Sequence, residues 1–326
     1  MIKFVGSNYQ YSGEILSTPE IIFIEDHHYN EESRSFPVQQ LLENSTCNPK
    51  DHVLVFDHVL QHNDVLADYH CIFLPLLLAR YVGQFGQQGI TPNWARKTRT
   101  FNFMINKTRI HRNFLLMLLE HFDLNNYEYT LCWKHNIVNR SRMLAEAPQY
   151  QDIITQAELT IPNRQYLFGT ERLLDQGLQY GSITNPEVYQ TFLQQAVFEP
   201  TCYSLITEPA FYERETIVTE KTIMAIYGGT MPIWVGGWRI ADWMRDQGFD
   251  VFDDIVDHSY QDLDDPYDRC YQAIYKNYEL LNDFETSKKF IECSQDRLQH
   301  NLDLLKQNRF QTECQDKTNA LGVKLF

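Results

Sequence analysis

The sequence predicts an α/β protein with two domains, and three observations support that fold class. Its 326 residues are about twice the roughly 150 residues typical of one domain, and 43% of them are hydrophobic, which is enough for two sizeable cores. Short β-branched or aromatic runs recur in the first hundred residues, each followed by polar, turn-rich sequence. From residue 98 onward the order strand, turn, helix, strand appears, which is the repeating unit of a parallel sheet.

The first predicted domain covers residues 1–95. Three apolar runs predict the strands of a small sheet: Ile2–Val5, residues 20–25 and Val53–Phe56. Residues 38–42 suggest a helical segment, whereas residues 71–81 fit a buried helix and a buried strand equally well. A stretch rich in Gly and Gln at residues 83–93 is the best candidate for a linker between the domains.

The second predicted domain covers residues 96–310 and has the pattern of a doubly wound sheet. Its predicted strands are residues 101–105, 127–133, 203–206 and 232–235. Apolar positions at helical spacing predict helices over residues 113–122 and 220–227. Asn185 followed by Pro186 indicates another helix start, because Asn caps well and Pro fits the first helical position.

The C-terminal part predicts one amphipathic helix over residues 284–308. Four apolar side chains share one face of it: Ile291, Leu298, Leu302 and Leu305. We expect this helix to pack back on the body of the protein, with residues 311–326 as a C-terminal tail.

Charge and composition exclude several classes of protein. The formal net charge of −15 should repel nucleic acid and anionic membranes, so an anionic ligand needs a locally basic pocket. The longest apolar run, residues 71–79, is far shorter than the roughly 20 residues of a transmembrane helix. The seven cysteines show no metal-ligand spacing, and the N-terminal residues show no secretory signal. We therefore expect reduced thiols, no metal site and a cytoplasmic location.

The segment from residue 205 to residue 236 carries the most chemical information. Thr219 can cap a helix whose N-terminal amides attract anions. In the first turn, the Glu220 carboxylate can accept from a ribose diol, and the Lys221 ammonium can neutralise a diphosphate. Such a strand-to-helix edge is where open α/β sheets bind nucleotides.

A second basic centre precedes the helix at residues 113–122. Lys107, Arg109 and Arg112 crowd its start, where the helix dipole disfavours cations unless an anion or an acidic neighbour is present. A bound diphosphate and a structural salt bridge are the two interpretations. His111 lies between the two arginines and receives no catalytic role.

These two segments resemble the α1,3-fucosyltransferase group and its uncharacterised bacterial and viral relatives. The order Thr219-Glu220-Lys221, helix, Gly228-Gly229, strand is similar to the C-terminal signature of that group. The turn ending at Arg112 looks like the one whose Arg contacts donor phosphates. Glu208 stands about where the group has a Glu-Asn pair, with Pro209 in place of the Asn. The two matches span residues 98–269, and the first domain is not covered.

The resemblance implies a GT-B-like fold, in which two Rossmann-like domains face a cleft, and an inverting, metal-independent sugar transfer. The donor would be a nucleotide diphosphate sugar, with GDP-fucose suggested by analogy, and the acceptor a glycan or glycolipid hydroxyl. In this scheme Arg109, Arg112, Lys107 and Lys221 bind the diphosphate, and Glu208, Thr219 and Glu220 complete the nucleotide site. No other cofactor is implied.

An inverting transfer also needs a general base, for which the first domain offers carboxylates after its predicted strands. Glu25 and Asp26 are the candidates after the second strand, and Asp57 and His58 after the third are equally good in position. Each of these residues is also compatible with an ordinary turn.

Two other functions remain open. A non-catalytic nucleotide-sugar-binding regulator would keep the basic centres and lack the base. A metal-dependent GT-A-type transferase would use the acidic run at residues 262–265, which contains one Asp-x-Asp pattern and also suits a solvated loop or a helix cap. Activity that vanished with EDTA and returned with manganese would favour the metal-dependent enzyme.

Overall fold

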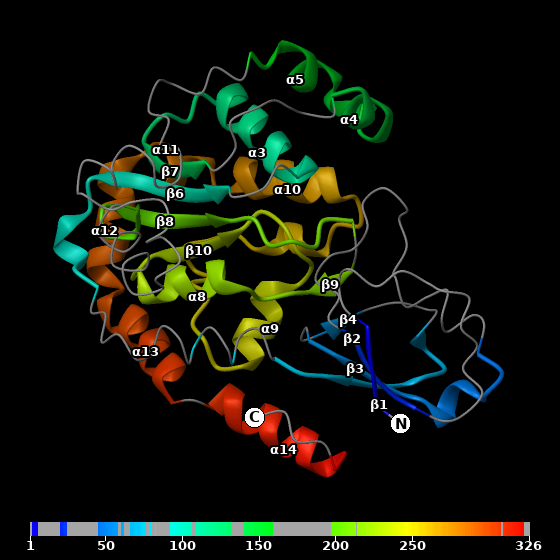
Figure 1. The fold of residues 1–326 in the computed structure, drawn as a ribbon. Coiled ribbons are helices and arrows are strands. Elements are labelled where there is room, and N and C mark those ends of the chain that lie inside the picture. The colour runs from blue at the N-terminus through cyan, green and yellow to red at the C-terminus, as the bar shows by residue number, and fades with distance from the viewer. Residues whose placement is uncertain are drawn as a thin grey trace, which may run out of the picture.

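Two parallel four-stranded sheets form the framework of the protein in the computed structural model (Figure 1). The structure describes residues 2–5, 20–24, 45–57, 60–61, 66–75, 79, 82, 92–105, 109–131, 140–158, 197–212, 214–307 and 309–322. The α/β class predicted from the sequence is therefore confirmed.

The first sheet is built from the N-terminal part of the chain. Its strands are β1 (Ile2–Val5), β2 (Ile21–Ile24), β3 (Val53–Phe56) and β5 (His70–Phe73). They are arranged in the order β1-β2-β3-β5, and every neighbouring pair is parallel. The three predicted strands are confirmed, and the undecided segment at residues 71–81 begins as a strand. Residues 38–42 and most of the predicted linker lie outside the described residues.

The second sheet has the order β10-β8-β6-β7, again with all pairs parallel. Its strands are β6 (Arg99–Ile105), β7 (Tyr127–Leu131), β8 (Thr201–Ile206) and β10 (Met231–Trp234). Every residue of β8 and β10 is buried. Continuous burial is expected where helices cover both faces of a parallel sheet, because no strand residue then faces water.

Two hydrophobic cores show that helices cover both faces of the second sheet. The helices that contribute to the first core are α3 (Ile110–His121), α4 (Arg140–Glu146), α5 (Gln151–Gln156), α10 (Pro266–Lys276), α11 (Tyr278–Asn282) and α12 (Phe284–Cys293). Those of the second core are α8 (Glu220–Tyr227), α9 (Ile240–Asp246), α13 (Gln295–Lys306) and α14 (Arg309–Ala320). The predicted doubly wound pattern therefore describes this part of the chain. The helix start predicted at Asn185 lies outside the described residues.

The predicted helix over residues 284–308 is wrong in its continuity. The chain leaves the helical conformation at Ser294, which separates α12 from α13. Ile291 and Leu298 belong to the first core, whereas Leu302 and Leu305 belong to the second. Because Leu298 already lies in α13, the chain passes from the first core to the second within α13, after the break. The segment expected as a tail is also mostly helical, because α14 extends to Ala320.

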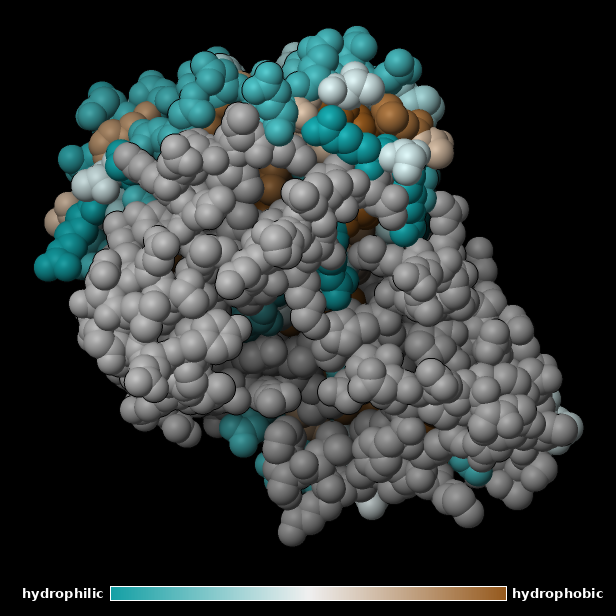
Figure 2. All heavy atoms as spheres, turned by 45° about the horizontal axis from the view of Figure 1, so that its top comes forward, coloured by the Kyte–Doolittle hydropathy of each residue, from teal (hydrophilic) through white to brown (hydrophobic). Residues whose placement is uncertain are grey.

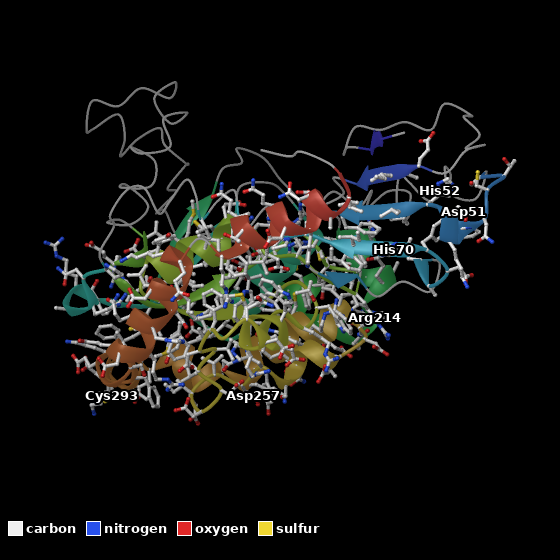
Figure 3. All side chains as sticks on the ribbon, turned by 90° about the horizontal axis from the view of Figure 1, so that it is seen from below. Asp51, His52, His70, Arg214, Asp257 and Cys293 are labelled. Carbon is white, nitrogen blue, oxygen red and sulfur yellow. The ribbon has the colours of Figure 1, made fainter. Side chains whose placement is uncertain are left out.

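Helix α14 brings the C-terminal part of the chain to the first sheet. Phe310 and Cys314 share the second core with Val55 and Leu74, and the Lys317 Nζ donates to the Phe73 carbonyl at 3.2 Å. Figure 1 shows α14 passing below both sheets, and Figure 3 shows it from below beside the strands of the first sheet. The prediction that residues 284–308 pack back on the body is confirmed by the four apolar side chains of that segment, which all lie in the two cores. Among the described residues, no helix has the length and apolar character needed to cross a bilayer.

Candidate functional site

The candidate site lies where two helices begin beside the end of β8. Helix α3 follows β6, and α8 precedes β10, and both strands are neighbours of β8 in the sheet. Residues 207–209 leave β8 at its carboxyl end, so they run between the two helix starts. We call the surroundings of residues 207–209, with the first turns of α3 and α8, the basic corner. Helix N-termini at such an edge offer unpaired amides and a positive dipole to an anion.

Two arginines at the start of α3 form hydrogen bonds with the loop that follows β8. The Arg112 Nη2 donates to the Thr207 carbonyl at 3.3 Å, and the Arg109 Nη1 donates to the Pro209 carbonyl at 3.1 Å. Arg112 is only 4% exposed. Arg109 and Arg112, which the sequence analysis predicts to bind phosphate, are therefore hydrogen-bonded to the residues on either side of Glu208.

Glu208 has a different role from the one implied by the resemblance. Its carboxylate is completely buried and accepts from the Thr219 amide at 3.0 Å, from the Thr222 hydroxyl at 2.7 Å and from the Thr219 hydroxyl. The Trp234 indole also donates to the Thr222 hydroxyl at 3.0 Å. Burial raises the pKa of Glu208, and the nearby Lys221 opposes this rise. Glu208 thus holds the first turn of α8 in place, and its oxygens are engaged there.

The first turn of α8 is built around Thr219, as the sequence predicts. Its hydroxyl caps the helix by accepting from the Lys221 amide, and it also accepts from the Lys221 Nζ at 3.1 Å. The same Nζ donates to the Glu220 carboxylate at 2.8 Å. Burial opposes ionisation of Glu220, but the Lys221 ammonium lowers its pKa overall, so the two form an ion pair. Lys221 is 8% exposed.

His111 lies between Arg109 and Arg112 at the start of α3. This imidazole is fully buried and stacks on the Phe211 ring, with centroids 5.1 Å apart. Burial lowers its pKa well below the usual value, and the positive charges of Arg112, Arg109 and Lys221 lower it further. One ring therefore lies within electrostatic range of cations from both helices, which are about 110 residues apart in the chain.

A two-stranded ribbon joins the first sheet to the same region. Strand β4 (Leu60–Gln61) pairs antiparallel with β9 (Glu215–Thr216), and Leu60 is opposite Thr216. Asp57, three residues before Leu60, directly follows β3 and is 7% exposed. Thr219 comes three residues after Thr216, and in an antiparallel pair these two directions lead to the same end. The chain therefore enters β4 from β3 and leaves β9 toward α8 at the same end of the ribbon.

Several predicted site residues lie outside the described residues: Glu25, Asp26, His58 and Lys107. The acidic run at residues 262–265 has structural partners. Asp265 caps α10 by accepting from the Tyr267 and Asp268 amides at 2.8 and 2.9 Å, and Asp262 pairs with Arg239 at 3.0 Å. No group of three or more metal-ligating side chains occurs within the part of the chain that the structure describes.

Two cavities lie away from the basic corner. One of about 430 Å³ is lined by α9 and by residues 253–262, and another of about 700 Å³ lies between β5, α9 and α14. Figure 2 shows the molecule with the top of Figure 1 tilted forward, and there the described surface is mainly hydrophilic with scattered apolar residues. Neither cavity is lined by Arg109, Arg112 or Lys221, so the basic corner is defined by its charges and helix starts.

Sequence reasoning assigned no role to His111 and placed the Glu208 carboxylate on the nucleotide. The signal for His111 was present, because a histidine flanked by two arginines at a helix start shares their electrostatic environment. The signal for Glu208 was absent, because its partners follow 11 and 14 residues later. Comparison of the chain with family models, with curated proteins and with solved structures finds no match.

Proposed function

We propose that this protein is an inverting glycosyltransferase of the GT-B type, which transfers a sugar from a nucleotide diphosphate sugar to a glycan hydroxyl. The observation that carries the proposal is the hydrogen bonding that joins two helix starts through residues 207–209. Arg109 and Arg112 donate to the Pro209 and Thr207 carbonyls, and Glu208 accepts from Thr219, whose hydroxyl accepts from Lys221. In sugar transfer, the departing diphosphate gains negative charge as the bond to the sugar breaks. Fixed cations and helix amides at that point stabilise the transition state more than the ground state.

The roles of the residues follow from their contacts. Arg109, Arg112 and Lys221 neutralise the diphosphate, and Lys107 belongs to the same group by its place in the sequence. Glu208 positions the start of α8, on which Thr219 and Lys221 sit. Glu220 accepts from the ribose while it keeps Lys221 oriented. GDP-fucose is the donor that the resemblance favours.

Among the described carboxylates, Asp57 is the candidate for the general base. It follows a strand of the first sheet, and the ribbon leads it toward the start of α8. A base must reach the acceptor hydroxyl while the sugar is attacked from the face opposite the diphosphate, so it belongs on the opposing domain. Glu25 and Asp26 remain alternatives from the neighbouring strand.

A metal-dependent GT-A mechanism is not favoured, because Asp262 and Asp264 of the Asp-x-Asp pattern already pair with arginines, Arg239 and Arg214 respectively. Asp265 caps α10. Activity that persists in EDTA is the expected result. A non-catalytic binding protein differs in one measurable property: an enzyme slowly releases free sugar from its donor in the absence of acceptor, and a binding protein does not.

The direct test is the Lys221→Ala variant, assayed by calorimetric titration with GDP. Loss of a hydrogen bond to a charged group costs about 1.5–3 kcal/mol, which weakens affinity roughly tenfold to a hundredfold. Lys276→Ala is the matched control, because Lys276 lies on α10 and pairs with Asp257 at 3.6 Å. Equal GDP affinity in the wild type and in Lys221→Ala would contradict the assignment.

A further inference from the structure

Burial lowers the pKa of the His111 imidazole well below its usual value. Its ring is 0% exposed, and neither ring nitrogen has a hydrogen-bond partner among the described residues. A buried polar group without a partner is costly, since it has given up its hydrogen bonds to water. Such a group at two helix starts indicates a partner that arrives with a ligand.

The groups that face His111 come from three elements. Arg109 and Arg112 lie beside it at the start of α3, and the charge of Lys221, in the first turn of α8, acts on it as well. From the loop after β8, the Phe211 ring stacks on it, and the Glu208 backbone lies close to it without the geometry of a hydrogen bond. The neighbouring Glu220 carboxylate is held by Lys221. The charged groups acting on the ring are therefore predominantly cationic.

We propose that His111 is a proton-linked contact for the donor diphosphate, neutral in the empty site and protonated when the diphosphate is bound. This inference rests on the proposed function and adds a residue and a mode of recognition to it. One proton comes from solvent as the ligand binds and returns to solvent as the nucleotide leaves. No covalent bond is made or broken at the ring.

Electrostatics gives the reason for the change. In the empty site, a fourth positive charge would be repelled by three cations in a region without bulk water. The two negative charges of a diphosphate diester offset that repulsion. A protonated imidazole has two N–H donors, one for a phosphate oxygen and one for the nearby Glu208 backbone. The site would thus respond to the number of negative charges on the ligand and discriminate against an uncharged nucleoside.

The test is calorimetric titration with GDP-fucose and, in parallel, UDP-glucose, whose diphosphate diesters keep a constant charge between about pH 6 and pH 8. Any protons taken up then come to groups on the protein. Titrations at pH 7 in two buffers of different ionisation enthalpy should show uptake of up to one proton per ligand. Affinity should rise as pH falls from 8 to 6, by at most tenfold per pH unit.

Two variants assign the proton to His111. His111→Gln keeps a polar side chain, and His111→Phe keeps an aromatic ring to stack on Phe211, so one serves if the other does not fold. Either variant should bind without proton uptake and lose the pH dependence of the wild type. His121→Gln, at the exposed C-terminal end of the same helix, is the control and should retain both.

The possible failures are distinguishable. If neither nucleotide sugar binds the wild type, the proposed function fails and this inference fails with it. If a nucleotide sugar binds without proton uptake, or if uptake persists in a folded His111 variant, the inference is overturned and the proposed function stands.

Discussion

Glu208 is a buried acid whose oxygens fix the start of α8. Its neighbours, the Thr219 amide and the hydroxyls of Thr219 and Thr222, are themselves buried and have been removed from water. The carboxyl group is therefore needed for the helix start even if it never touches a ligand. Substitution of Glu208 should therefore lower the free energy of unfolding whether or not it changes the affinity for a nucleotide.

Two substitutions of Glu208 should differ sharply. Glu208→Ala leaves buried donors without an acceptor and should lower the free energy of unfolding by about 1–3 kcal/mol. Glu208→Gln retains an acceptor oxygen and should be closer to the wild type. Urea denaturation at a fixed pH measures both, and equal stability of the three proteins would contradict the role of the carboxyl group.

The same site predicts a pH dependence of stability. Because burial raises the pKa of Glu208, the unfolded chain loses this proton at a lower pH than the folded protein does. The contribution of Glu208 to the free energy of unfolding should be complete below about pH 4.5 and should decline as pH rises through the folded-state pKa. Glu208→Gln should lack this decline. The free energy of unfolding of the wild type and of Glu208→Gln is measured by urea denaturation from pH 4.5 to pH 8. The difference between them gives the contribution of Glu208 without that of other titrating groups.

At the residue scale, the sequence predicted what depends on near neighbours. Thr219 was identified as a cap because its partner, the Lys221 amide, lies two residues away. The environment of His111 includes the charge of Lys221, which acts on it only after β6, β8 and α8 have assembled. No local pattern contains that information.

At the scale of elements, the β4–β9 ribbon is the feature that connects the proposed chemistry to the first sheet. Both of its strands are two residues long, and their antiparallel register relates the end of β3 to the start of α8. Asp57 directly follows β3 and lies three residues before this connection.

If Asp57 is the general base, Asp57→Asn should slow sugar transfer without weakening nucleotide binding. The variant should bind GDP with wild-type affinity and transfer sugar roughly 100- to 10,000-fold more slowly, the usual contribution of a general base. Asp51→Asn is the control. Asp51 is exposed on the short helical turn before β3 and is labelled in Figure 3. Calorimetry gives the affinity and a coupled assay of nucleotide release gives the rate. An unchanged rate would move the base to another residue, with Glu25 and Asp26 as the next candidates.

The glycines between α8 and β10 have a structural explanation that does not need a nucleotide. Gly229 has a φ of 63°, and a Cβ there would lie 2.3 Å from the Trp94 Nε1. A Cβ on Gly228 would lie 2.4 Å from the Cβ of Phe198. The Gly228-Gly229 pair is therefore explained by a tight turn. The residues of the motif that could act on a ligand are those at the helix start, residues 219–221.

The strands were predictable because their apolar runs are short and bounded by turn residues. The break at Ser294 was not, because Ile291, Leu298, Leu302 and Leu305 keep helical spacing across it. Their periodicity shows that they are buried, but it does not show that they enter two different cores.

At the scale of the whole molecule, the second core spans both sheets. Val55 and Leu74 come from the first sheet region, whereas Ile223 and Phe310 come from α8 and α14. A shared core makes separate unfolding of the two sheets unfavourable, because either one would expose the apolar face of the other.

Phe310→Ala should therefore destabilise both sheets together, by about 3–5 kcal/mol. Trp94 packs against the first core and Trp234 lies in β10, so the fluorescence of these two side chains reports the second sheet. Burial raises the pKa of the Cys71 thiol in β5 to about 11, so its alkylation should be slow until the first sheet opens. The two probes should give the same urea midpoint in the wild type and an equal shift in the variant. Separate midpoints would show that the sheets unfold independently.

The position of α14 also sets a delay in biosynthesis. Val55 and Phe310 meet in one core but are 310 − 55 = 255 residues apart in the chain. At about 5–20 residues per second, a ribosome needs roughly 13–50 s to travel between them. The first sheet therefore spends that interval without the helix that later covers it, and the nascent chain must stay soluble with an apolar surface still open.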